Sequence, residues 1–233
     1  SAVRKWLGVD FEGFTYPEKF LTMSTDWPIE KHLPNLALVN YVSDATEWVV
    51  LLRVPGLWRV LVPADASTSD AELLSETKKN SVFDRLVGDG EAVRTAHRTV
   101  YRVHQRVADR FVLGRVILIG DAAHLNNPLG GFGMNSGIHD AMNLCEKLAT
   151  VMSTQGRREE LLGRFERQRR TVTRSFIQQQ TIRNKQDMEL GSAEAERQRR
   201  EEMSRVVASP EARRQFMLRQ SMIQSVREAA EIH

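Results

Sequence analysis

The chain has 233 residues, of which 41% are apolar, and a formal net charge of +3. This length and composition support one large or two modest domains with a hydrophobic core, and they exclude a disordered or fibrous protein. No run approaches the ~18 apolar residues of a membrane span, and no export leader precedes the first charged residues. We therefore expect a cytoplasmic protein with no membrane partner. The single cysteine, Cys145, excludes an internal disulfide and a multi-cysteine metal site, so no metal is expected.

The charges of the C-terminal third are mixed in sign. The run Arg157-Arg158-Glu159-Glu160 is an example, and such runs are typical of solvated helix faces. A nucleic-acid surface would need a patch of positive charge with aromatic side chains among the basic ones. We therefore expect no nucleic-acid partner.

The first part of the chain predicts an antiparallel sheet. Residues 49–52 and 58–62 are rich in β-forming residues and are separated by a segment that contains Pro55-Gly56, which predicts a hairpin with a Pro-Gly turn. Three further segments have the same character: residues 19–24, 37–42 and 99–103. Between them, Ser69 caps a short helical pattern and a second helical pattern surrounds residues 83–87.

The pattern changes after residue 115. Residues 116–119 form a continuous apolar run that ends at a glycine, which predicts a strand covered on both faces. Such a parallel strand needs parallel neighbours, and the chain contains no second run of this type. After Gly133 a helix is predicted, with a buried stripe at three- and four-residue spacing. The stripe comprises Ile138, Ala141, Met142, Cys145, Leu148, Ala149 and Met152.

Residues 157–232 are predicted to be helical, with breaks near Gly191-Ser192 and Ser209-Pro210. Near their end, an apolar stripe rich in methionine covers residues 216–226. It could cover an active site, pack on the body of the protein, or pair with a second subunit in a homodimer.

The segment from residue 116 to residue 144 has the chemistry of a cofactor site. Asp121 follows the strand, where a carboxylate can accept hydrogen bonds from sugar or ribityl hydroxyls. The turn at residues 128–133 contains three glycines, so its backbone can approach a flat ligand closely. The free amides of Gly133, Met134 and Asn135 would begin the helix and suit the electron-rich edge of a reduced flavin. The alternative is a plain strand, turn and helix with a glycine corner.

A family resemblance rests on the same segment. The residues that carry it are Gly120-Asp121-Ala122-Ala123-His124, Pro128, Gly130-Gly131, Gly133-Met134-Asn135, Gly137-Ile138, Asp140-Ala141 and Asn143-Leu144. Together they resemble the second flavin-binding motif of the class A FAD-dependent aromatic hydroxylases, the para-hydroxybenzoate hydroxylase-like family. The chain departs from that motif at Asn127, His139 and Cys145, where proline, glutamine and tryptophan are frequent in the family.

The resemblance extends to the first residues. Ser1-Ala2-Val3-Arg4 resembles the segment that follows an Asp-Gly dipeptide in this family, and the chain contains no Gly-x-Gly-x-x-Gly fingerprint. We therefore expect an incomplete, C-terminal portion of a longer enzyme, which alone binds FAD poorly and is inactive.

The resemblance implies a mixed α/β fold. We expect part of a flavin-binding Rossmann-like domain, an antiparallel β-sheet substrate domain and C-terminal helices. The expected boundaries are residues 1–13 for the tail of the FAD domain, 14–108 for the substrate domain, 109–154 for the strand, turn and helix of the FAD domain, and 155–233 for the helical region.

The implied activity is hydroxylation of a phenolic small molecule with FAD, NAD(P)H and dioxygen. Asp121 would bind the ribityl chain, Pro128, Gly131 and Gly133 would lie beside the ring, and Met134 and Asn135 would contact its pyrimidine edge. Arg4 would lie near the phosphates. The alternatives are a flavin-dependent reductase without hydroxylation and a truncated, non-catalytic interaction module.

The substrate residues are weaker predictions, and no catalytic residue is assigned. A phenol needs a base or a hydrogen-bond partner to raise the electron density of its ring. The candidates by residue type are His97, His104, Tyr41 and His124. For His124 a capping or packing role in the turn is an equal alternative.

Overall fold

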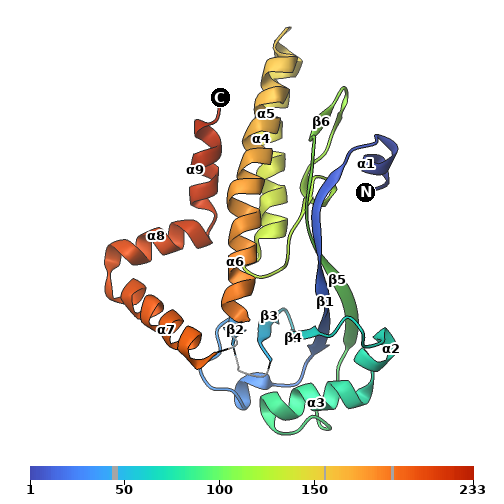
Figure 1. The fold of residues 1–233 in the computed structure, drawn as a ribbon, viewed down its shortest axis with the longest axis vertical. Helices are drawn as coiled ribbons and strands as arrows, with labels where there is room; N and C mark the ends of the chain where they lie inside the picture. Colours follow the sequence, from blue (N-terminus) through green and yellow to red (C-terminus); the bar gives the residue numbers. More distant parts are fainter. Residues whose placement is uncertain (44–46, 155, 190–191) are drawn as a thin grey trace. The chain divides into compact units, whose positions relative to one another are not determined.

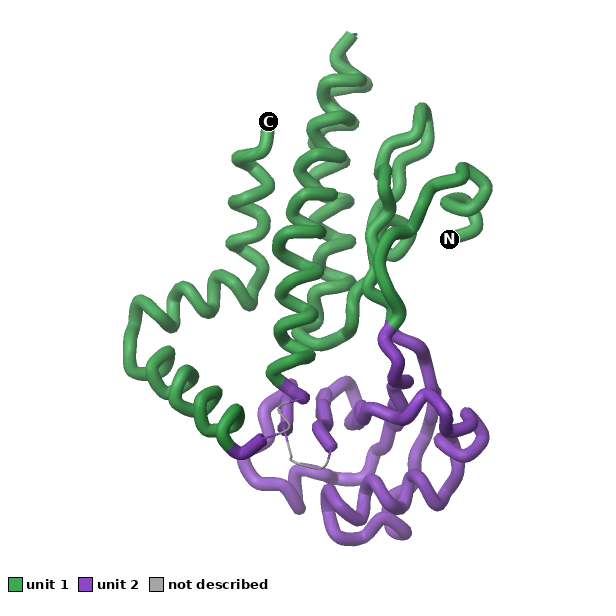
Figure 2. Tube along the Cα trace, in the orientation of Figure 1, with its two compact units in different colours: residues 1–15, 104–187, 194–233 green, residues 16–103, 188–193 purple. Residues whose placement is uncertain are grey.

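The computed structural model describes residues 1–43, 47–154, 156–189 and 192–233. The chain divides into two compact units, which Figure 2 shows in different colours. Unit 1 comprises Ser1–Thr15, His104–Asp187 and Glu194–His233, and unit 2 comprises Tyr16–Val103 and Met188–Ala193. The domain roles expected from the sequence stay a prediction.

The first part of the chain contains all the described strands and a few short helices, and the part from residue 132 onward is helical (Figure 1). The strands are β1 Phe11–Thr25, β2 Val39–Val42, β3 Val49–Val54, β4 Leu57–Ala64, β5 His97–Ala108, β6 Val112–Leu113, β7 Val116–Ile117 and β8 His124–Leu125. The α-helices are α1 Ala2–Trp6, α2 Asp70–Leu73, α3 Glu76–Val87, α4 Phe132–Ser153, α5 Arg158–Val172, α6 Gln179–Met188, α7 Ala193–Ala208, α8 Pro210–Gln220 and α9 Ile223–Glu231. Short 3₁₀ turns occur at η1 Ile29–Lys31 and η2 Gly120–Ala122, and η3 Thr173–Gln178 is a π-helix.

The largest sheet confirms the predicted antiparallel hairpin. Its strand order is β2-β3-β4-β1-β5-β8. Strands β3 and β4 pair as far as Val54 opposite Leu57, which leaves Pro55 and Gly56 as a two-residue turn. Gly56 has a φ of +75°, a conformation that glycine adopts without steric cost. The mixed α/β fold expected from the sequence is therefore present.

The core of unit 2 lies between the sheet and α3. Alternate residues of a strand point to opposite faces, so Leu21 and Met23 of β1 pack with Val82 and Phe83 of α3. On the other face of β1, Phe20 contacts the rings of Trp48 and Tyr101 edge-on, at centroid distances of 5.3 and 5.8 Å.

Residues 116–119 do not form the expected parallel strand. Only Val116 and Ile117 are in a strand, β7, and this strand pairs with β6 as an antiparallel hairpin. Leu118 continues as extended chain, and its amide donates to the carbonyl of Phe111 at 2.8 Å. The apolar run predicted a strand correctly, but the described residues include no parallel neighbour, so its backbone groups pair locally instead.

Helix α4 lies beside α5 in unit 1, and α9 packs against α5 (Figure 1). Most of the expected buried stripe of α4 is wrong: Ile138 is 50% exposed, Met142 is 61% exposed, and Cys145 is exposed as well. Leu148 of the same stripe is partly buried against the core. The face that is buried carries Ser136, Asp140 and Leu144 instead. The periodicity identified the helix correctly, but periodicity alone does not say which side of a helix meets the rest of the chain.

The C-terminal helices break at Ser209-Pro210, as expected. Helix α7 ends at Ala208 and α8 begins at Pro210, with Ser209 as its cap; the other predicted break includes Gly191, which lies outside the described residues. In the methionine-rich stripe, Met222 is buried and packs with Phe132 and Ile177, whereas Met217 is exposed. Among the described residues, the structure contains no helix with the length and apolar character needed to cross a membrane.

Candidate functional site

The turn that carries Asp121 packs directly on α4. Gly120 has a φ of +54°, and a Cβ atom on Gly137 of α4 would lie only 3.2 Å from the Cα atom of Gly120. The two backbones approach this closely because both positions are glycine. The η2 turn then closes with a hydrogen bond from the Ala123 amide to the Gly120 carbonyl at 2.8 Å. Asp121 is exposed at the centre of this turn.

A buried carboxylate holds the turn in place. Asp140 Oδ2 accepts hydrogen bonds from the Gly120 amide at 3.0 Å and from His124 Nε2 at 2.8 Å, and Oδ1 accepts from Arg169 Nε at 2.7 Å. Burial opposes ionisation of Asp140, but the hydrogen bond from His124 and the charge of Arg169 outweigh it and hold its pKa below the ordinary value. An ionised carboxylate with three donors is the arrangement in which a buried charge is tolerated.

Arg4 supports the same turn from another element. The α1 helix begins at the cap Ser1 and buries the Arg4 side chain, whose Nη1 donates to the Ala122 carbonyl at 2.8 Å. Its guanidinium lies 3.5 Å from the centroid of the Phe11 ring. Burial and then the charge of Arg106 lower its pKa. Arg4 thus lies next to Asp121, and its expected role at the cofactor phosphates stays a prediction.

The glycine turn that precedes α4 is exposed on its surface. Gly130 and Gly131 have φ values of +98° and +69°, and the Gly131 amide donates to the Pro128 carbonyl at 3.0 Å. Pro128 and Gly131 are exposed, while Leu129 between them is buried. A backbone that turns through two left-handed residues needs glycine at both positions.

The helix begins one residue earlier than expected. Because Gly131 is the N-cap, the amides without an intrahelical partner include those of Phe132, Gly133 and Met134, rather than that of Asn135. The Asn135 side chain instead donates from Nδ2 to the Gly131 carbonyl at 2.8 Å. Met134 is 75% exposed, so the first turn of α4 is open to a ligand.

Gly133 differs from the glycines of the turn. Gly133 has no left-handed φ, and a Cβ atom there would meet only Asn126 at 3.5 Å or more. Gly130 is the obstructed position, because a Cβ atom there would lie 2.3 Å from the Phe132 ring and 2.5 Å from Asn184 Nδ2.

The candidate substrate residues do not form one cluster. In unit 2, Tyr41 is on β2 and His97 is exposed at the start of β5, with three strands between them in the sheet order. In unit 1, His104 Nδ1 lies 2.8 Å from Thr15 Oγ1, and His124 is buried against Asp140. The His124 position fits the packing alternative, since its other ring nitrogen is also buried.

Sequence reasoning missed the residues behind the site. Arg169 could have been found, because it falls on the apolar face of α5 with Leu162, Phe165 and Val172, where a charged residue needs a buried partner. Three residues that contact the loop at residues 125–129 also went unnoticed: Gln178, Thr181 and Asn184. No local motif marks them.

The comparisons with known proteins agree with this geometry. The model of the FAD binding domain family matches residues 1–180. The chain therefore belongs to the FAD binding domain family, which confirms the predicted cofactor, FAD. The resemblance to aromatic hydroxylases is also confirmed, because the relatives include monooxygenases of phenols.

Two relatives illustrate the similarity. The para-nitrophenol 4-monooxygenase of Pseudomonas sp. (strain WBC-3) is 36% identical over 181 residues, which are 76% of this chain and 44% of that protein. The 6-hydroxy-3-succinoylpyridine 3-monooxygenase of Pseudomonas putida (strain DSM 28022 / S16) is 35% identical over 176 residues, 75% of this chain and 43% of that protein. The chain thus spans less than half the length of these two relatives.

Solved structures show the same fold. A p-nitrophenol 4-monooxygenase from Pseudomonas putida DLL-E4 superposes with a TM-score of 0.84 at 30% identity, covering 97% of this chain and 56% of that one. The anhydrotetracycline hydroxylase of Streptomyces rimosus has a TM-score of 0.72 at 25% identity, covering 95% of this chain and 44% of that one.

Proposed function

We propose that the protein containing this chain is an FAD-dependent monooxygenase that hydroxylates a phenolic small molecule with NAD(P)H and dioxygen. One observation carries the proposal. An exposed carboxylate, a glycine turn and the free amides of a helix N-terminus stand together in unit 1, fixed from behind by the buried Asp140. The relatives named as phenol monooxygenases support the reaction class.

The donors and acceptors of this surface suit a flavin. Asp121 is exposed and would accept hydrogen bonds from ribityl hydroxyls. Pro128 and Gly131 would lie beside the ring, and the first amides of α4, including those of Gly133 and Met134, would donate to its pyrimidine edge. Asn135 would act through its bond to the Gly131 carbonyl. When bound, FAD supplies the transfer of electrons from NAD(P)H and the activation of dioxygen.

The substrate would be held by the sheet of unit 2. Phe20 and Tyr101 form an aromatic pair on the face of β1 that is turned away from α3, and Tyr101 is partly exposed. Phe20 is fully buried, so the exposed part of the Tyr101 ring is what would contact a flat phenolic ring. Tyr41, His97, His104 and His124 stay candidates by residue type for contact with the phenol hydroxyl. A homodimer and a cytoplasmic location are further expectations.

The experiment uses the full-length protein that contains these residues. The purified protein is expected to carry FAD, and p-nitrophenol or a related phenol should stimulate NADPH or NADH oxidation and appear as a product one oxygen atom heavier. Oxidation of NAD(P)H without an oxygenated product would favour the reductase alternative. Purified protein with no affinity for FAD would favour the non-catalytic module.

Asp121→Ala tests the assignment of the ribityl ligand. Loss of a hydrogen bond to a charged group costs about 1–3 kcal/mol, so the FAD dissociation constant should rise about fivefold or more. Asp26→Ala is the matched control, since Asp26 is also an exposed aspartate but belongs to unit 2. FAD titration of the apoprotein measures both, and unchanged affinity in Asp121→Ala would contradict the assignment.

A further inference from the structure

One continuous helical segment lies directly behind the loop that leads into the glycine turn. Gln178 Nε2 donates to the Leu125 carbonyl at 2.9 Å, and Asn184 Nδ2 donates to the Leu129 carbonyl at 3.1 Å. Between them, the Thr181 carbonyl accepts from Asn127 Nδ2 at 2.8 Å. Every third residue of the helix thus meets every second residue of the loop, and all of these residues belong to unit 1.

Gln105 of β5 closes this contact from the sheet side. Its Oε1 accepts from the Asn127 amide at 3.0 Å, and its Nε2 donates to Thr181 Oγ1 at 2.9 Å and to the Gln178 carbonyl at 3.2 Å. Gln105, Asn127 and Thr181 are each at most 1% exposed. A buried polar network with its partners in place fixes one arrangement, because any other would leave buried donors unpaired.

The Asn184 amide has a defined orientation. Arg219 of α8 donates to Gln180 Oε1, and Gln180 Nε2 donates to Asn184 Oδ1 at 2.8 Å. Since Asn184 Oδ1 already accepts this bond, Nδ2 is the atom that faces the Leu129 carbonyl. Asn184 also touches the turn itself, because its Nδ2 is the atom that a Cβ on Gly130 would meet at 2.5 Å.

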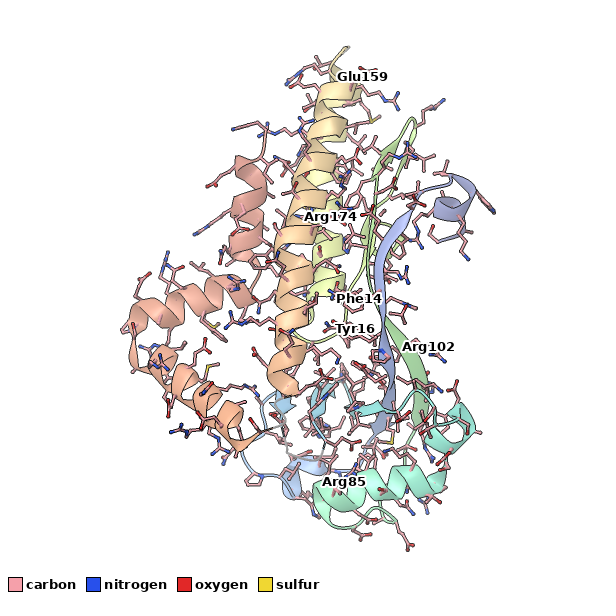
Figure 3. The ribbon with its side chains drawn as sticks, viewed as in Figure 1. Phe14, Tyr16, Arg85, Arg102, Glu159 and Arg174 are labelled. Carbon is pink, nitrogen blue, oxygen red and sulfur yellow. The ribbon has the colours of Figure 1, made fainter. Side chains whose placement is uncertain are left out.

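The helical segment is irregular at this point. Thr173–Gln178 is a π-helix between α5 and α6, and π-helical turns within α-helices are frequent at functional sites. Arg174 within it pairs with Glu12 of β1, and Figure 3 shows Arg174 about midway along this helical segment. The segment is therefore anchored on the sheet as well as on the loop.

We propose that Gln178, Thr181 and Asn184 are positioning residues for FAD. They hold the carbonyls of Leu125 and Leu129 and the side chain of Asn127, and so present Pro128, Gly131 and the first amides of α4 in the orientation that the flavin ring requires. The inference rests on the proposed cofactor site and deepens it, since these three residues act through the loop.

The test compares variants of the positioning residues with a variant of the adjacent, exposed Gln179 in the same helical segment. Gln178→Ala and Asn184→Ala remove the two side-chain donors, and Gln179→Ala is the matched control, because Gln179 is the adjacent glutamine and is exposed. In the full-length protein, the FAD dissociation constant should rise about three- to tenfold in the two variants, as expected for one lost hydrogen bond each. It should stay within about twofold in Gln179→Ala.

Thr181 supplies a conservative rescue. Thr181→Val removes the hydroxyl that accepts from Gln105 and should weaken FAD binding and alter the visible circular dichroism of the bound flavin, whereas Thr181→Ser should restore both. The melting temperature of each apoprotein is measured alongside, so that a variant that folds normally but binds FAD weakly identifies positioning.

Two outcomes would overturn the inference in different ways. Folded Gln178→Ala, Asn184→Ala and Thr181→Val proteins with wild-type FAD affinity and spectrum would refute positioning while leaving the proposed function intact. A wild-type full-length protein without affinity for FAD would refute the proposed function and the inference together.

Discussion

Gly130 and Gly133 of the turn would respond differently to an added methyl group. Gly130→Ala forces a left-handed φ on alanine and a Cβ atom into contact with Phe132 and Asn184, so it should destabilise the fold by roughly 1–3 kcal/mol. Gly133→Ala has room and should leave the free energy of unfolding unchanged or raised by up to ~1 kcal/mol. Urea denaturation of the apoproteins measures both.

FAD titration of the same two variants distinguishes a loss of fold stability from a direct effect on FAD binding. Weaker FAD binding in a stable Gly133→Ala protein would support close approach of the flavin to the α4 amides. Equal destabilisation by the two substitutions would contradict the geometry of the turn.

His139 gives the site a pH dependence. Burial and then the charge of Arg169 lower its pKa below 6.5, against the opposing charge of Asp140. The folded state thus favours the neutral ring, while the unfolded chain takes up a proton below about pH 6.5. This contribution to stability is fully present above that pH and is lost as the pH falls through the lower pKa of the folded state.

His139→Gln should therefore flatten the fall of unfolding free energy as the pH is lowered below about 6.5. Urea denaturation at several pH values measures the slope. Asp140 does not confuse the result, because its pKa is lowered from 3.8 and its contribution is lost only in more acidic solution. A slope identical to that of the wild type would show that His139 does not titrate differently in the two states.

At the residue scale, the motif identified Asp121 and the glycine turn as candidate residues, but not the side chains that hold them in place. Asp121, Pro128 and Gly131 lie within a contiguous pattern, so a resemblance can place them. Asp140 lies in the motif as well, but its role depends on Arg169, which is 29 residues further along the chain. The meeting of these two side chains follows from the packing of α4 on α5, which no local pattern encodes.

At the element scale, α4 presents an apolar face to solvent within the described chain. Replacing Ile138 and Met142 by glutamine should change the free energy of unfolding of the 233-residue chain by no more than about 0.5 kcal/mol per site, because both side chains are at least half exposed. Leu144→Ala on the opposite, buried face should cost about 2–5 kcal/mol.

Gel filtration and urea denaturation of these variants test the assignment of faces. The double glutamine variant should also associate less, since an exposed apolar stripe favours contacts between copies. A loss of stability as large as that of Leu144→Ala would mean that Ile138 and Met142 are covered in solution.

Some elements could be predicted from the local sequence pattern and others could not. The hairpin across Pro55-Gly56 was predictable, because period-two strands and turn chemistry are both local. The antiparallel pairing of residues 116–117 was not predictable, because an apolar run predicts a strand but does not identify its partner strand. The π-helix at Thr173–Gln178 has no sequence signal that we recognise.

At the scale of the whole molecule, the isolated 233-residue chain should bind FAD weakly, with a dissociation constant above about 1 µM. Apart from Arg4, expected near the phosphates, the residues assigned to the cofactor concern its ring and ribityl chain, and the sequence has no Gly-x-Gly-x-x-Gly for the adenosine diphosphate half. FMN, which lacks the adenosine part, should therefore bind the isolated chain within about threefold of FAD.

Flavin fluorescence titration with both cofactors measures this ratio. Sub-micromolar binding of FAD together with much weaker binding of FMN would contradict the prediction, since it would require an adenosine site within these residues. The full-length protein is the comparison, because the chain spans only 44% of its para-nitrophenol 4-monooxygenase relative.

The sequence by itself determined the family and the cofactor and proposed the residues that would face it, because a motif of some twenty-five residues is contiguous and needs no knowledge of packing. It also determined the hairpin and the helix cap at Ser69, which depend on neighbours a few residues apart. Only the tertiary structure decided that Asp140 and Arg169 hold the Asp121 turn, that Gln178, Thr181 and Asn184 face the loop behind the glycines, and which side of α4 is buried. These features join side chains that are tens of residues apart, and their partners become neighbours only when the helices and strands pack.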